Sequence, residues 1–159
     1  MSFNRVKKLR IAPEQTSPCD VPELGPDAVL HLAYAGEVNK EYFNARFGEG
    51  IAAAEKAAER PSRARKALKE IVKKEGNTKA ARERDRTLFA QYIVKGWTDV
   101  LDDDDAKPPY TVEDMQTIID DLCSDPSTVP IFDRIRGHAN DPLNYREMPG
   151  DLNETAKNS

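Results

Sequence analysis

The sequence predicts a mainly α-helical fold. It should consist of a small helical domain followed by a disordered C-terminal tail, and a short N-terminal β-hairpin could precede the helices. Apolar residues recur at three- and four-residue steps in several stretches between residues 39 and 140, which is typical of amphipathic helices. Hydrophobic residues make up 38% of the chain and charged residues 33%, so part of it should be solvated. We therefore expect an extended or β-forming segment at 1–38, a helical domain at 39–147 and a disordered tail at 148–159.

The N-terminal segment contains prolines at positions 13, 18, 22 and 26, which favour extended backbone. A short strand is predicted at residues 6–11. Residues 28–35 form a short apolar run that is bounded by Gly25-Pro26 and by Gly36. A run of this length favours a buried strand over a helix.

The first helix of the central domain should follow Asn39, whose side chain is suited to cap a helix N-terminus. Phe43 and Phe47 then follow at helical spacing. Gly48 and Gly50 should weaken and bend this helix, because each glycine costs about 1 kcal/mol relative to alanine in a helix interior. We therefore expect this element to rearrange easily.

Two further helices are predicted before residue 98. Pro61 cannot continue a helix, so the next one should begin near Ser62 and stop at Gly76-Asn77. Thr78 can cap the helix after it. The apolar positions of that third helix are Phe89, Tyr92, Ile93 and Trp97.

The last two helices have clear boundaries in the sequence. Thr111 can accept a hydrogen bond from the amide of Asp114 and so cap a helix. A final helix should follow residues 125–127, hold Pro130 in its first turn and end before Asp141-Pro142. The predicted buried residues of the two helices are Val112, Met115, Ile118, Ile119, Leu122, Ile131, Phe132 and Ile135.

The net charge of −4 conceals a strong asymmetry along the chain. Residues 55–86 hold twelve Lys or Arg against six Asp or Glu, whereas residues 99–159 hold five against fifteen. The two segments therefore carry net charges of +6 and −10. Such a distribution favours head-to-tail self-association or a charged partner.

Several classes of site lack support in the sequence. No membrane span or signal peptide is predicted, and Cys19 and Cys123 are read as reduced thiols, since they form no zinc-type pair. The spacing of Asp102, Asp104 and Glu113 fits a calcium-binding loop, but Ala106 and Lys107 occupy positions that need an oxygen ligand and a glycine. His31 and His138 are interpreted as packed or capping residues. We expect no enzyme activity and no catalytic, cofactor-binding or metal-binding residues.

One stretch carries a family resemblance. Val94, Gly96 and Trp97 match a "V-x-G-W" pattern, Lys107-Pro108 follows an acidic turn, and Pro109, Tyr110 and Glu113 lie in or beside a match to "x-[FY]-[ST]-x-E". Residues 139–145 resemble an "A-x-D-x-x-N-[FY]" ending. In this order and spacing, the motifs resemble those of bacteriophage tail assembly chaperones, except that Ala106 stands where the family often has glycine.

Gly96 next to Trp97 would let a helix end or bend, which indicates a structural role for these motif residues. The resemblance implies a function in virion morphogenesis. Such proteins act in the host cytoplasm, bind the tape measure protein, keep it soluble and promote polymerisation of the tail tube, without being retained in the virion. Many members also reach the tail tube protein through an extended form made by programmed frameshifting. Ala156-Lys157-Asn158 can be encoded with a slippery heptamer, so a frameshift is expected near the C-terminus.

The resemblance does not identify the partner-binding surface. We predict that Phe43 and Phe47 contribute to it as exposed apolar residues, because two nearby glycines make that helix easy to rearrange. Two other functions stay open: a small nucleic-acid-binding regulator that uses basic helices at 60–86, and a virion head–tail joining protein. Interleaved acids and the lack of aromatic residues in the basic stretch make nucleic-acid binding unlikely as the main role.

Overall fold

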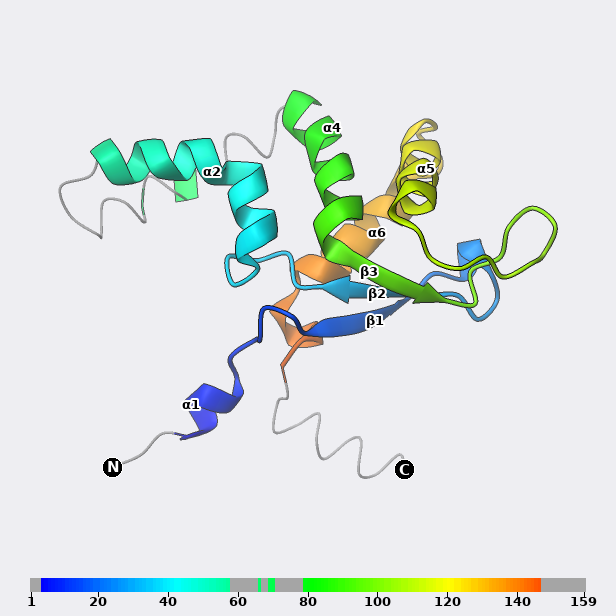
Figure 1. Cartoon of the computed structure of the whole chain (residues 1–159), viewed down its shortest axis with the longest axis horizontal. Coiled ribbons are helices and arrows are strands. Elements are labelled where there is room, and N and C mark those ends of the chain that lie inside the picture. Colours follow the sequence, from blue (N-terminus) through cyan, green and yellow to red (C-terminus); the bar gives the residue numbers. More distant parts are fainter. Residues whose placement is uncertain (1–3, 58–65, 67–68, 71–78, 147–159) are drawn as a thin grey trace.

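The computed structural model describes residues 4–57, 66, 69–70 and 79–146. A three-stranded antiparallel sheet lies against a group of helices, and the first helix extends away from both (Figure 1). The helices are α1 (Asn4–Lys8), α2 (Lys40–Ala57), α4 (Lys79–Leu88), α5 (Val112–Cys123) and α6 (Val129–Asn140). The short turns of helix are η1 (Pro22–Leu24), η2 (Phe89–Ile93) and η3 (Pro142–Asn144). The strands are β1 (Thr16–Asp20), β2 (Val29–Ala33) and β3 (Val94–Thr98).

Strand β2 is the centre of the sheet, with β1 on one side and β3 on the other. Both pairings are antiparallel, and the β2–β3 register shifts between His31 and Leu32. Alternate residues of β2 point into the core, where Leu30 and Leu32 are fully buried. The strand predicted within residues 28–35 is therefore confirmed as β2. Pro18 lies in the middle of β1, an edge strand, which is where a sheet tolerates proline.

The prediction of a mainly α-helical fold is wrong, since the described residues form a mixed α/β fold around this sheet. The cause is β3, a strand within the stretch predicted to be helical. A two-stranded hairpin alone is marginally stable at best, and a third strand with covering helices gives it a core. Leu30, Leu32 and Val94 consequently belong to one buried cluster together with helical residues.

The helix predicted to run from Thr78 through Trp97 is wrong beyond Ile93. Helix α4 ends at Leu88, one turn of π-helix follows in η2, and the chain then becomes extended. The β-branched pair Ile93-Val94 fits a strand better than a helix interior. Trp97 stands four residues after Ile93, so it fits the helical period although it lies in β3.

The two C-terminal helices are confirmed. Thr111 caps α5 by accepting a hydrogen bond from the amide of Asp114 at 3.1 Å, and α6 ends at Asn140 as predicted. The side chains of Met115 and Ile119 are fully buried, whereas Val112 is 38% exposed and does not belong to the core. The other fully or nearly fully buried residues of these helices are Phe132, Ile135 and Ala139.

The elements before residue 79 agree only in part with expectation. Asn39 caps α2, because its Oδ1 accepts from the amide of Tyr42 at 3.3 Å, and the α2 ribbon changes direction partway along its length (Figure 1). The strand predicted at 6–11 is wrong, since α1 occupies Asn4–Lys8 and only Ile11 is buried there. The helix predicted from Ser62 and the tail at 148–159 lie outside the described residues, apart from isolated helical positions at 66 and 69–70.

A buried ionic cluster joins α2, α4 and α6. Asp85 of α4 is 2% exposed and accepts a hydrogen bond from the Tyr42 hydroxyl. Its carboxylate also lies 3.2 Å from the Arg136 guanidinium and 3.6 Å from that of Arg46. Burial, reinforced by the charge of Asp85, raises the pKa of Tyr42, so the phenol stays protonated and donates.

The C-terminal end of the described chain returns to the sheet. The Tyr145 hydroxyl donates to the carbonyl oxygens of Leu32 and Ala33 at 3.0 and 3.1 Å, and its ring is 3% exposed. The amide of Ala35 donates to the carbonyl of Ala139 at 2.8 Å. Residues of the "A-x-D-x-x-N-[FY]" ending thus fasten α6 and η3 to β2. Among the described helices, none is both long and apolar enough to span a bilayer.

Candidate functional site

Three residues of the family motif, Val94, Trp97 and Tyr110, are joined alongside β3. The Trp97 indole Nε1 donates to the carbonyl of Pro108 at 2.9 Å, and its ring packs edge-on against Tyr110 with centroids 5.1 Å apart. The Tyr110 hydroxyl donates to the carbonyl of Val94 at 2.9 Å. Burial, and to a lesser extent the charge of Glu113, raise the pKa of Tyr110, which keeps this donor protonated. These contacts hold the segment before α5 against β3.

The other motif residues have simpler positions. Val94 is buried, Gly96 lies opposite His31 in the sheet, and Pro109 and Glu113 are exposed. The interpretation of Gly96 as the end or bend of a helix is wrong, because it lies within β3. A Cβ atom at Gly96 would approach only the His31 ring, at 3.9 Å, so space alone does not require glycine there.

An acidic loop follows β3. The Asp102 carboxylate accepts hydrogen bonds from the amides of Asp104 and Ala106, both at 2.9 Å. The backbone adopts positive φ at Asp99 and Asp105, with values of 57° and 58°. Ala106 is not among the positive-φ residues, so alanine fits where the family often has glycine. In the described part of the chain, no three His, Cys, Asp or Glu side chains are grouped to hold a metal ion.

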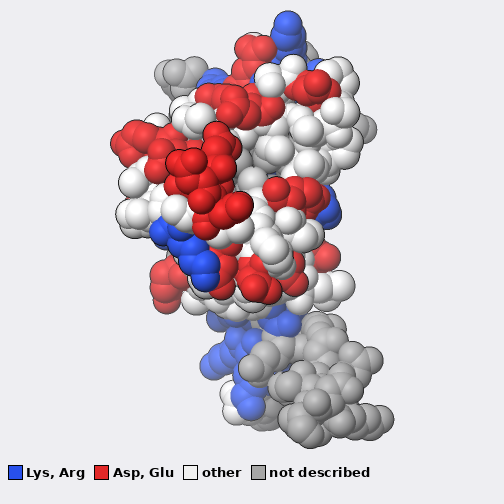
Figure 2. All heavy atoms as spheres, turned by 90° about the vertical axis from the view of Figure 1, so that its right-hand side faces the viewer, with Lys and Arg blue, Asp and Glu red and all other residues white. Residues whose placement is uncertain are grey.

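An open groove of about 860 Å³ lies between this loop, η1 and the first turns of α5. Partly buried apolar side chains line its floor, while carboxylates stand around its rim. The floor includes Leu24, Trp97, Leu101, Pro108 and Ile118, and the rim includes Glu23, Asp102, Asp103, Asp105 and Asp114. Figure 2 shows acidic side chains gathered over the face of the molecule that bears this loop.

Two ion pairs modify the charge around the groove. Arg134 lies 2.6 Å from Glu23, and this hydrogen bond lowers the pKa of Glu23. Lys107 lies 3.0 Å from Asp99. The described residues provide no such partner for the carboxylates of Asp103 or Asp114. The rim therefore keeps a net negative charge.

Sequence reasoning did not find this groove, because its η1 side is about 75 residues away from its β3 side in the chain. The amide of Leu101 donates to the carbonyl of Leu24 at 2.9 Å and so joins the two sides. The available signal was local: the apolar pair Val100-Leu101 directly precedes four aspartates. That pattern indicates an apolar surface beside an acidic one, but not the partner segment that completes the groove.

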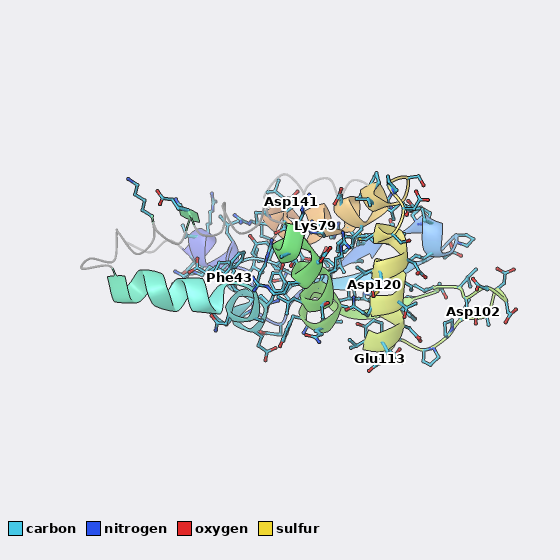
Figure 3. All side chains as sticks on the ribbon, turned by 90° about the horizontal axis from the view of Figure 1, so that it is seen from above. Phe43, Lys79, Asp102, Glu113, Asp120 and Asp141 are labelled. Carbon is cyan, nitrogen blue, oxygen red and sulfur yellow. The ribbon has the colours of Figure 1, made fainter. Side chains whose placement is uncertain are left out.

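The predicted partner-binding residues lie elsewhere, on α2. Phe43 is half-buried, Phe47 is 3% exposed, and their ring centroids are 4.9 Å apart. Figure 3 shows Phe43 and Asp102 toward opposite ends of the molecule. The expectation that both phenylalanines are exposed is wrong for Phe47. The structure does not bring either of them to the motif residues.

A second hollow, of about 390 Å³, lies beside β1 and the end of α6. Here the Ser17 hydroxyl is 2.9 Å from His138 Nε2, and burial lowers the pKa of His138. Burial also raises the pKa of the nearby Cys19 thiol, which therefore stays protonated. The packed role predicted for His138 agrees with these contacts. His31 makes a similar contact, with its Nε2 at 2.8 Å from Thr98 Oγ1.

Comparison with known proteins gives a family. A family model described as YdaY prophage protein matches residues 44–158. Neither the curated proteins nor the solved structures yielded a match. The family match includes β3, the acidic loop, α5 and α6, so it covers the motif residues and one side of the groove. Because it spans well over half of the chain, this phage-derived protein belongs to the YdaY prophage protein family.

Proposed function

We propose that the protein is a tail assembly chaperone, which acts in the host cytoplasm, binds the tape measure protein and promotes tail tube polymerisation without remaining in the virion. The observation that carries this proposal is the hydrogen-bonded unit of Val94, Trp97 and Tyr110. These residues carry the resemblance, and their contacts join β3 to the segment before α5. Membership of a prophage family supports a phage origin.

The tape-measure-binding surface is assigned to α2. This helix reaches to the side of the body opposite the acidic loop, and its half-buried Phe43 packs on the buried Phe47 (Figure 3). A long apolar partner needs a large apolar surface, and repacking of these two rings would enlarge the one that α2 offers. Tyr42 and Asn39 hold the start of the helix while the rings repack.

Coexpression with the tape measure protein of the same prophage tests the proposal. The chain should move the tape measure protein from the insoluble to the soluble fraction and copurify with it. Phe43→Ala should weaken capture about fivefold, as expected when loss of an interface aromatic costs about 1 kcal/mol. Leu143→Ala is the matched control, because Leu143 is an apolar residue that is 57% exposed elsewhere. A tape measure protein that stays equally insoluble with the chain present would contradict the proposal.

Two measurements address the rest of the proposed pathway. Mass spectrometry of purified virions should not detect the protein, whereas a head–tail joining protein would be abundant there. Contact with the tail tube protein is assigned to a frameshift-extended form. Synonymous codons that disrupt the heptamer over Ala156-Lys157-Asn158 should remove that form and leave the short chain unchanged.

A nucleic-acid-binding regulator is the second candidate, because α4 places basic side chains on the surface. Lys79, Arg82 and Arg84 are exposed there. Binding by these residues would weaken steeply with salt, since counterion release dominates such affinity. Retention on DNA at low salt that is lost in Lys79→Glu/Arg82→Glu would favour the regulator over the chaperone.

A further inference from the structure

The groove beside the acidic loop offers an apolar floor that the described chain does not cover. Leu24, Trp97 and Ile118 are each partly exposed along it. Its volume of about 860 Å³ is in the range, roughly 300–1,000 Å³, of pockets that bury most of a small ligand. The groove therefore suits a short peptide segment better than a folded domain.

The rim determines the charge of that segment. Asp103 of the loop and Asp114 of α5 both line the groove, and Asp102 and Asp105 add to the same negative field. Glu23 is compensated by Arg134, and Lys107 is engaged by Asp99. A segment that complements this groove must therefore carry several cations next to an apolar side chain.

Helix α1 and the residues after it have this composition. Arg5, Lys7, Lys8 and Arg10 are all exposed, and Val6 among them is 56% exposed. The segment extends from the body on the side away from the groove (Figure 1). It cannot reach the groove of its own chain without leaving this position.

We infer that the groove binds residues 4–10 of a second copy of this chain, with Val6 on the apolar floor and the four cations against the rim carboxylates. The contact uses different surfaces on the two copies, so it is heterologous. One copy keeps an unoccupied groove, and the other keeps residues 4–10, the basic arm, available for a further contact. Repetition produces an open, head-to-tail row. This inference does not require the proposed function.

The full chain tests the inference by sedimentation velocity at concentrations up to about 100 μM. The average mass should rise with concentration in about 50 mM salt and fall in about 500 mM salt, where screening shortens the range of such contacts. Arg5→Glu/Lys7→Glu/Lys8→Glu should weaken association at least tenfold. Lys79→Glu/Arg82→Glu is the matched control for basic residues on α4 and should leave association unchanged. Val6→Asp is a second variant, which changes the net charge by only one unit. It should also weaken association, because it removes the apolar side chain from the floor of the groove.

A charge exchange separates a specific contact from general repulsion. Asp103→Lys/Asp114→Lys should also be monomeric alone, because the lysines cancel the remaining charges of Asp102 and Asp105 and the rim no longer attracts the basic arm. Mixed with the Glu-substituted arm variant, it should associate as a heterodimer, since its unchanged basic arm meets the unchanged acidic groove of the arm variant. Circular dichroism confirms that the variants are folded.

Three outcomes would overturn the inference: a wild-type chain that stays monomeric throughout, association lost in the α4 control but kept in the arm variant, or no recovery in the mixture. Tape measure coexpression is a separate assay. A monomeric chain that still solubilises the tape measure protein would therefore reject this inference alone.

Discussion

Gly25 has no room for a side chain, and the nearest atom is part of the backbone. Its φ is +150°, which L-amino acids rarely adopt, and a Cβ atom would lie 2.8 Å from the Asp99 carbonyl oxygen. The same atom would lie 3.1 Å from Leu101 Cγ. The close approach of η1 to the loop after β3, and therefore the shape of the groove, depends on this glycine.

Replacement of Gly25 by alanine should destabilise the protein by about 1–3 kcal/mol, since a strained backbone and a clash are imposed together. Gly137→Ala is the control: it lies inside α6 with no heavy atom within 4 Å of the added Cβ. That change should stabilise the protein by up to about 1 kcal/mol, because alanine is the better helix former. Urea unfolding measures both, and equal effects would contradict this role of Gly25.

The helices and strands differ in how well they could be predicted from the sequence. Helices α5 and α6 carry their own signals, such as the Thr111 cap and Asp141-Pro142 at the end, so local rules found them. Strand β3 carries no local signal that outweighs the helical spacing of Trp97. It becomes a strand because β2 offers a partner edge about 60 residues earlier. The groove shares this difficulty, since η1 and β3 meet only in the folded chain.

Three helices depend on one buried carboxylate. Asp85 of α4 meets Tyr42 and Arg46 of α2 and Arg136 of α6. Removal of one member of a buried ion pair leaves the remaining charge uncompensated, whereas an exposed pair contributes little. The attachment of α2 to the body is therefore expected to be sensitive to this residue.

Asp85→Ala should lower the free energy of unfolding by about 3 kcal/mol or more. Glu23→Gln, which breaks the surface pair with Arg134, should cost less than about 1 kcal/mol. Thermal and urea unfolding measure both variants. A loss in Asp85→Ala no larger than in Glu23→Gln would show that the cluster does not hold the helices together.

For the whole molecule, stability should depend on pH through His138. Burial lowers the pKa of His138 in the fold, so the unfolded chain binds more protons below about pH 6.5. Stability is therefore complete above that pH and is lost as pH falls through the lower pKa of the folded state. Ser17 contacts the ring and joins β1 to α6 at this point.

Urea unfolding between pH 5 and 7.5 tests this expectation, because this window lies above the usual range of carboxylate titration. Wild-type stability should decline toward pH 5, and His138→Gln should flatten the decline. His31→Gln is the matched control and should show the same decline as the wild type. A decline that is unchanged in His138→Gln would assign it to other groups.

Pro18 in β1 affects how neighbouring copies of the protein can contact one another. An exposed sheet edge offers a template for strands of neighbouring molecules, and such pairing leads to aggregation. Proline lacks an amide hydrogen, and a sheet tolerates it where the nitrogen faces away from the neighbouring strand, so this edge lacks a donor at its midpoint. Backbone pairing between copies is thereby discouraged at β1. Contacts between molecules are left to side-chain surfaces, which can form and separate without disturbing the sheet.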